Sequence, residues 1–341
     1  MDEGGFALAL VVLILFAIGA AGTAGYQIVR SEALQAQLAG EAAQALAVAE
    51  AGLQWFTASQ GGTVTDTATH LVNGGTARIS TRKVVALSPR EDLFLITARG
   101  TVTDPRRPRL PAARTVSHYA IHSRMPLRPL GALVTTAPRV RVRATGVVDG
   151  TDHSHAGQCP TVPSLSVAGV VARANVQAVG GGMVAGAPAD ITLGSFGNVV
   201  AAVGLPWDLL RDPSFPVEYD DRWPSFATLG EDAFPAIRVT GDFSATGDRS
   251  GRGLLVVTGT LKVPANSQWH WKGIVLAGDL EAIGPTTAFT LEGMLVAGQG
   301  SRMDNWDMDS GTVAFHSCYA YRAGAAIARL TPLANSWFEG V

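Results

Sequence analysis

The chain contains few charged residues and only two cysteines. Asp, Glu, Lys and Arg make up 16% of its 341 residues, against roughly 25% in ordinary globular proteins. The formal net charge is −2, so the sequence lacks the basic surplus of a nucleic-acid-binding protein, and no nucleic-acid partner is expected. Cys159 and Cys318 form neither a CxxC pair nor a zinc-ligand pattern.

Catalytic motifs are missing as well. The sequence holds no GxSxG, HExxH or P-loop motif. The segment GGGMVAG (180–186) is glycine-rich, but Pro188 follows it instead of a helix, which favours a turn over a phosphate-binding loop. We therefore expect a protein that is not an enzyme and that uses no cofactor.

Glycine, in contrast, is abundant. The chain has 39 glycines and 18 prolines, which separate many short Val- and Leu-rich runs. This mixture predicts many short strands joined by tight turns.

A long apolar run lies near the N-terminus. No charged residue occurs between Phe6 and Val29, and as a helix this run would extend roughly 36 Å, enough to cross a bilayer. A secretory signal peptide needs a basic residue ahead of such a run and a small-residue cleavage site after it, whereas here Asp2 and Glu3 precede the run. Residues 6–29 therefore predict a single-pass membrane anchor.

The helical pattern continues beyond Arg30. Apolar residues recur every three or four positions, on one face of a helix, until the polar residues around Gln60: Leu34, Leu38, Ala42, Ala45, Ala49, Leu53 and Phe56. We expect one helix over residues 6–60, whose first half lies in lipid and whose second half is amphipathic.

The segment Gly5-Phe6, the uncharged run and the later segment AEAGL (49–53) resemble the N-terminal region of type IV pilins. The resemblance is strongest to the PilX-like minor pilins and covers roughly the first 60 residues. It implies that residues 1–5 are a leader, that a prepilin peptidase cuts after Gly5, and that Phe6 becomes the methylated N-terminus. It also implies contacts with other pilins through the helix, first in the inner membrane and then in a pilus at the cell surface.

Two features depart from the family pattern. Major pilins carry Glu at mature position five, where this chain has Leu10; the resemblance therefore implies a low-copy subunit. Pilin leaders are usually basic, whereas Asp2 and Glu3 are acidic. By the positive-inside rule an acidic flank does not favour a cytoplasmic N-terminus. A true start upstream of Met1 would remove this conflict with the pilin pattern. A simple single-pass anchor is the alternative interpretation of this region.

Residues 61–125 read as a small antiparallel sheet. Three segments are rich in β-branched residues and partly alternate: TARISTRKVVAL (76–87), DLFLITARGTVT (92–103) and ARTVSHYAIHSR (113–124). The amphipathic part of the helix is expected to cover one face of this sheet, as in pilins.

Residues 126–341 carry a repeat. The segments GLLVVTG (253–259), GIVLAG (273–278) and GMLVAG (293–298) begin 20 residues apart, and such a period predicts a parallel β-solenoid, with a β-sandwich as the alternative. A Pro- and aromatic-rich insertion near 205–236 is expected to cap or staple its side. The fold class is therefore α+β: a long helix, a pilin-like antiparallel sheet and a Gly-rich β-solenoid.

Two pairs of residues stand out in this region. Cys159 and Cys318 would lie outside the inner membrane, where thiols pair, so a disulfide between them is possible; two separate buried thiols are the alternative. Trp269 and Trp271 share one face of a strand, where they would either form an exposed binding surface for sugars or fill a buried corner.

Two segments contain potential metal ligands. DGTDHSHAGQC (149–159) gathers polar ligands without the spacing of a known site: Asp149, Asp152, His153, His155 and Cys159. In DNWDMDSG (304–311), Asn305, Asp307 and Asp309 alternate as calcium ligands do, but the glycine and the final glutamate of such a loop are out of place. A polar loop is the preferred interpretation of both, and no metal is expected.

These features together predict a bacterial minor pilin or pilus assembly protein that displays a solenoid, with a possible adhesive role. A large type II secretion pseudopilin is the alternative from related machinery. A membrane-tethered β-helix protein that binds or cleaves carbohydrate is the alternative from another class; it would need acidic residues clustered on one solenoid face, and few are present.

Overall fold

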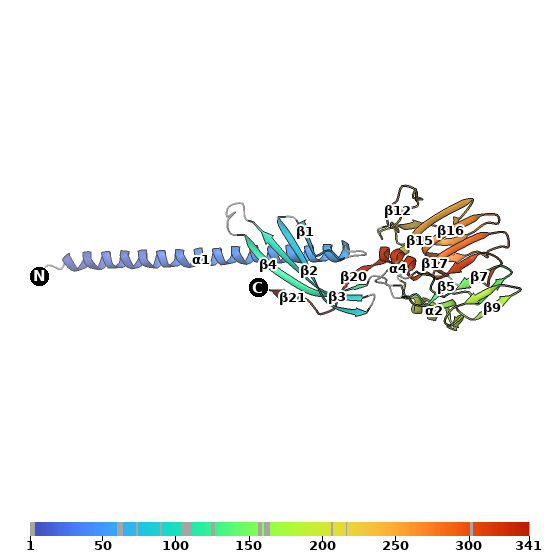
Figure 1. Ribbon diagram of the computed structural model, residues 1–341. Helices are drawn as coiled ribbons and strands as arrows, with labels where there is room; N and C mark the ends of the chain where they lie inside the picture. Colours follow the sequence, from blue (N-terminus) through green and yellow to red (C-terminus); the bar gives the residue numbers. More distant parts are fainter. Residues whose placement is uncertain are drawn as a thin grey trace.

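The computed structural model is elongated (Figure 1). A long helix extends from one end, an antiparallel sheet lies beside the C-terminal part of this helix, and a larger body of parallel strands forms the other end. The structure describes residues 4–59, 64–72, 74–88, 91–103, 111–123, 127–155, 159, 164–205, 207–215, 217–300 and 303–340, with side chains described from Leu10 onward.

The helix α1 spans Gly4–Ser59 without interruption, which confirms the prediction of one long N-terminal helix. At about 1.5 Å per residue it extends roughly 84 Å. Of the predicted apolar stripe, Ala45, Ala49, Leu53 and Phe56 are buried, whereas Leu34 and Leu38 remain exposed. Among the described residues, the buried positions of the helix therefore lie in its C-terminal third.

That partner is an antiparallel sheet, as predicted. Its strands are β1 (Thr67–Val72), β2 (Gly75–Ser88), β3 (Glu91–Val102) and β4 (Ala112–Ser123), paired in this order. Two strands from the C-terminus, β20 (Arg329–Pro332) and β21 (Phe338–Gly340), pair with β4 along its outer edge. The final residues therefore belong to this sheet and not to the region that the sequence assigned to residues 126–341.

Small residues allow α1 to lie close to the sheet. A Cβ atom on Gly100 would meet the backbone of Ala45 and Ala49, and one on Gly52 would meet the side chain of Ala77. The buried core between helix and sheet is built from Ala, Val, Ile, Leu and Phe side chains, as the amphipathic pattern requires.

The chain between β4 and β20 forms the parallel module, residues 127–328, in which every described strand pairing is parallel. Its strands are β5 (Gly131–Thr135), β6 (Arg139–Arg143), β7 (Val147–Asp149), β8 (Ala168–Ala172), β9 (Asn175–Val179), β10 (Met183–Ala185), β11 (Asp190–Thr192), β12 (Tyr219–Asp220), β13 (Ala236–Val239), β14 (Phe243–Ser244), β15 (Asp248–Lys262), β16 (Gln268–Leu280), β17 (Ala288–Ala297), β18 (Trp306–Met308) and β19 (Thr312–Ala314).

The 20-residue spacing of the sequence repeats sets the register between the three longest of these strands, because residues 20 positions apart are partners on adjacent strands. Gly253 of β15, Gly273 of β16 and Gly293 of β17 are successive partners. All three have positive φ, and a Cβ on Gly293 would meet the carbonyl group of Gly273. Glycine is required here because the backbones of adjacent strands approach too closely for a side chain.

The strands of the module do not stack in chain order. Strand β17 pairs with β5, the first strand of the module, and β5 pairs in turn with β8. The last long strand of the module therefore lies next to its first strand, and the two ends of the stack are formed by internal segments of the chain.

In the described part of the module, the strands are accompanied by the α-helices α2, α3 and α4 and a short 3₁₀-helix, η1. Helices α2 (Phe196–Val203) and α3 (Trp207–Arg211) lie in the connection between β11 and β12. Helix α2 comes just before the predicted insertion, and α3 lies within it. Helix α4 (Ser317–Gly324) and η1 (Ala325–Ile327) lead back toward the antiparallel sheet, and α4 lies at the junction of the two bodies in Figure 1.

Candidate functional site

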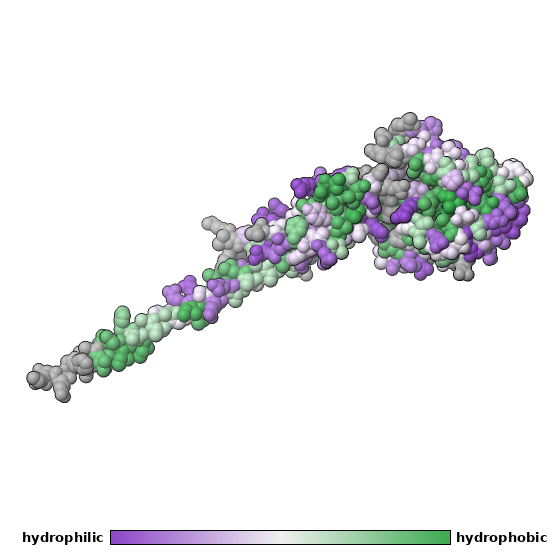
Figure 2. Space-filling model, turned by 90° about the horizontal axis from the view of Figure 1, so that it is seen from below, coloured by the Kyte–Doolittle hydropathy of each residue, from purple (hydrophilic) through white to green (hydrophobic). Residues whose placement is uncertain are grey.

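The exposed part of α1 is the first candidate. From Leu10 to Gly40 every residue is exposed, and the apolar side chains there contact no other part of the described chain. Figure 2 shows hydrophobic surface along the outer part of this helix. By length and composition the helix can cross a membrane, so single-pass membrane anchoring is consistent with the structure.

The predicted processing site adjoins this surface. Gly5 and Phe6 lie in the first turns of α1, but their side chains lie outside the described residues. Gly19, Gly22 and Gly25 have open space where a Cβ atom would stand. Another helix can approach α1 closely at such positions.

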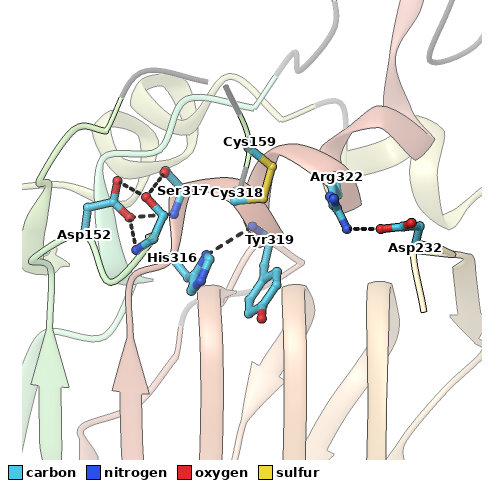
Figure 3. Close-up of a disulfide and its surroundings, with 9 residues drawn as sticks. Asp152, Cys159, Asp232, His316, Ser317, Cys318, Tyr319 and Arg322 are labelled. Carbon is cyan, nitrogen blue, oxygen red and sulfur yellow. Dashed lines mark hydrogen bonds and ion pairs between the residues drawn. A yellow bond between two sulfur atoms is a disulfide. The ribbon is translucent and has the colours of Figure 1, made fainter. Parts of the chain in front are cut away.

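The second candidate is the end of the parallel module around α4, where the structure joins the two cysteines. Cys159 and Cys318 form a disulfide, with Cα atoms 5.5 Å apart. Figure 3 shows this bridge at the start of α4, beside Asp152, His316 and Tyr319. The bridge ties the loop after β7 to the helix that leads out of the module.

Asp152 holds the same two segments together. Its carboxylate accepts hydrogen bonds from the backbone N–H of Ser317 (2.9 Å) and from the backbone N–H and hydroxyl of Ser154 (3.0 and 2.9 Å). Burial raises the pKa of Asp152, but these hydrogen bonds outweigh burial and lower the pKa to about 2. The carboxylate is therefore a structural acceptor at the beginning of α4.

His316 caps α4 from the other side. Its Nδ1 accepts a hydrogen bond from the backbone N–H of Tyr319 (3.3 Å), and the two rings stack with centroids 3.7 Å apart. Burial lowers the pKa of His316, against the weaker opposite effects of Glu292 and Asp152. A neutral imidazole can accept this hydrogen bond, whereas a protonated one cannot.

The remaining potential metal ligands of the loop 149–159 are engaged separately. Asp149 lies 2.9 Å from His153 Nε2 and also accepts from the backbone N–H of Thr151, while Cys159 is in the disulfide. In the part of the chain that the structure describes, no three His, Cys, Asp or Glu side chains form a group that could hold a metal. Asp149 and Cys159 thus have partners within the protein.

The calcium interpretation of residues 304–311 is not supported. Arg141 binds both carboxylate oxygens of Asp307 (2.8 and 2.7 Å), and Arg143 lies 3.2 Å from Asp307 and 2.9 Å from Asp309. Asn305 precedes β18, so this segment contains a strand and is not the loop that its polar residues predicted. The guanidinium groups of β6 therefore neutralise these carboxylates.

Of the two expectations for Trp269 and Trp271, the exposed sugar-binding surface is wrong, and the buried corner is what the structure has. Both side chains are buried, with 1% and 0% exposure. Trp271 donates from Nε1 to the carbonyl oxygen of Gly253 (3.1 Å) and packs against Trp223 and Phe226 of the insertion. The aromatic residues of the insertion thus cover the module interior, in agreement with a capping role.

A buried arginine that the sequence analysis did not single out organises the same insertion. Arg238 is only 2% exposed and binds both carboxylate oxygens of Asp220 (2.9 and 2.7 Å). It also donates to the carbonyl oxygens of Asp212 and Phe215. A single arginine in a short strand gives no sequence signal that its side chain is buried.

Comparison with protein-family models, with curated proteins and with solved structures gives no match. Function is therefore inferred from the residues and their arrangement.

Proposed function

We propose that this protein is a minor pilin or pilus assembly protein, anchored by α1 and assembled with other pilins through the same helix. The observation that carries the proposal is the division of α1. Its residues from Leu10 to Gly40 are uncovered, and largely apolar up to Val29, while Ala45 to Phe56 pack on an antiparallel sheet. The pilin-like segments Gly5-Phe6 and AEAGL support it from the sequence.

The uncovered helix has two uses in this proposal. In the inner membrane its apolar surface is solvated by lipid. In a filament the same surface packs against the helices of neighbouring pilins, where Gly19, Gly22 and Gly25 allow close approach. A prepilin peptidase removes residues 1–5 before assembly, and Phe6 is then methylated.

We further propose that the parallel module is a β-solenoid displayed outside the cell, with an adhesive role. Parallel pairing, the 20-residue register and the glycines at equivalent positions support a solenoid over a sandwich of antiparallel sheets. The module lies at the end of the molecule opposite the apolar helix (Figure 1), which suits display away from the membrane.

The processing step gives the direct test. Mass spectrometry of the protein recovered from membranes should find an N-terminus at methylated Phe6. Gly5→Leu should leave the precursor uncut, while Gly4→Leu, one residue away, should still be processed. An intact Met1, or a cut near Ala21, would contradict the pilin assignment.

The role in the filament is tested in a deletion strain. Loss or shortening of pili, with another pilin still abundant, is expected because Leu10 lacks the carboxylate of major pilins. Purified filaments in which this chain is the dominant protein would contradict a low-copy role. Intact pili combined with lost protein secretion would point to a type II secretion pseudopilin.

A further inference from the structure

The outer face of the antiparallel sheet, opposite α1, carries an unusual arginine pair. Arg78 of β2 and Arg99 of β3 are direct cross-strand partners. Their neighbours in sequence, Ala77, Ile79 and Ala98, are buried against α1, so alternation places both arginines on the outer face. Both arginines are exposed.

Like charges directly opposite each other on adjacent strands are destabilising. Among the residues that the structure describes, neither Arg78 nor Arg99 forms an ion pair with an acid. Arg82, four residues along β2 and also exposed, has no such partner either. The nearest acid on the same face of β3 is Glu91. It lies four residues along the strand from Leu95, which is the cross-strand partner of Arg82, so about 13 Å of strand separates Glu91 from the row of Arg82.

Hydroxyl groups surround the arginine pair. Thr69 and Thr115 flank it in the same cross-strand row. The next row holds Thr67, Ser80, Thr97 and Ser117 and ends at Phe338 of β21, and the Thr97 and Ser117 hydroxyls lie 2.9 Å apart. This part of the face thus places guanidinium donors beside exposed hydroxyl groups, whereas Ser117 is buried.

We propose that this face binds an acidic polysaccharide along β2, with Arg99, Arg78 and Arg82 contacting its carboxylate or sulfate groups. The three cations extend over about 13 Å of strand, which suits a polymer that carries repeated negative charges. The chain as a whole has a net charge of −2, so this cationic face is a local feature. The exposed hydroxyl groups beside the arginine pair can hydrogen-bond to the hydroxyl groups of a glycan.

Binding is tested with the full chain in nonionic detergent, using fluorescently labelled heparin and polygalacturonate as probes and neutral dextran as the comparison. Both acidic polymers should bind at low salt and be released as salt rises. The double variant Arg78→Thr, Arg99→Thr should weaken binding by about tenfold or more. The matched control, Arg211→Thr with Arg222→Thr, removes the same charge from exposed positions of the parallel module and should bind as the unmodified protein does.

A thermal melt provides an independent readout. Because Arg78→Thr with Arg99→Thr removes a like-charge contact, its melting temperature at low salt should equal or exceed that of the unmodified protein. Either polymer should raise the melting temperature of the unmodified protein and not that of the double variant. Equal loss of binding in the control variant, equal binding of dextran, or binding of inorganic sulfate without either polymer would overturn the proposal.

Discussion

Leu133 of β5 and Leu295 of β17 are register partners in adjacent parallel strands, although almost the whole parallel module separates them in the chain. Both side chains are fully buried. Their contact closes the module, because it brings the last long strand against the first. It also explains how the chain can enter from β4 and leave toward β20 on the same antiparallel sheet.

This closing contact should make a large contribution to stability. Leu133→Ala removes buried methyl groups and leaves a cavity, so it should lower the free energy of unfolding by about 3 kcal/mol. Chemical denaturation of the full chain in detergent measures the change. Leu165→Ala, at an exposed position of the same module, should change stability by less than about 0.5 kcal/mol, and equal effects of the two variants would contradict the assigned role.

The glycines at equivalent positions should be sensitive to any side chain. Gly273 has φ 129°, and a Cβ there would meet the carbonyl oxygen of Gly253. Gly273→Ala should therefore destabilise the module by about 2–4 kcal/mol. Gly284→Ala is the control, because Gly284 has open space around it. The denaturation midpoint of this variant should stay near that of the unmodified protein.

The disulfide closes a long loop, since 159 residues separate Cys159 from Cys318. In the chain-entropy model this contributes about 5 kcal/mol, so Cys159→Ser with Cys318→Ser should lower the melting temperature markedly. The proposed processing after Gly5 should not change, because a prepilin peptidase would act at the N-terminus. Alkylation of the denatured, unreduced protein should modify no thiol, and two modified thiols per chain would refute the bridge.

Stability should fall in mildly acidic solution. Burial lowers the pKa of both His316 and His118 below the ordinary value of 6.5. The unfolded chain therefore binds more protons than the folded one as the pH drops through about 6.5, and the free energy of unfolding decreases. Asp152, with a pKa of about 2 in the folded protein, adds a second loss of stability below about pH 4.

The histidine contribution can be separated by substitution. His316→Asn keeps a side chain suited to cap α4 but does not titrate. It should therefore reduce the loss of stability between about pH 7.5 and pH 5, measured by denaturation at several pH values. An unchanged pH dependence in this variant would show that His316 does not carry the effect.

The sequence by itself determined those elements whose signal is local and periodic. The charge-free run and the apolar stripe predicted α1, because a helix needs only its own hydrogen bonds and one apolar face. The β-branched segments predicted β2, β3 and β4, and the spacing of Gly253, Gly273 and Gly293 predicted the register of three parallel strands. The pilin-like segments and their processing remain predictions from sequence.

The tertiary structure decided everything that depends on contacts between distant segments. It showed that β20 and β21 return to β4, that Leu295 lies beside Leu133, and that Cys159 meets Cys318. It also decided which polar residues are engaged: Asp307 with Arg141, and Arg238 buried against Asp220. Local patterns cannot give these results, because burial and ion pairing depend on which segments meet in space, and that is set by the free energy of the whole packed chain.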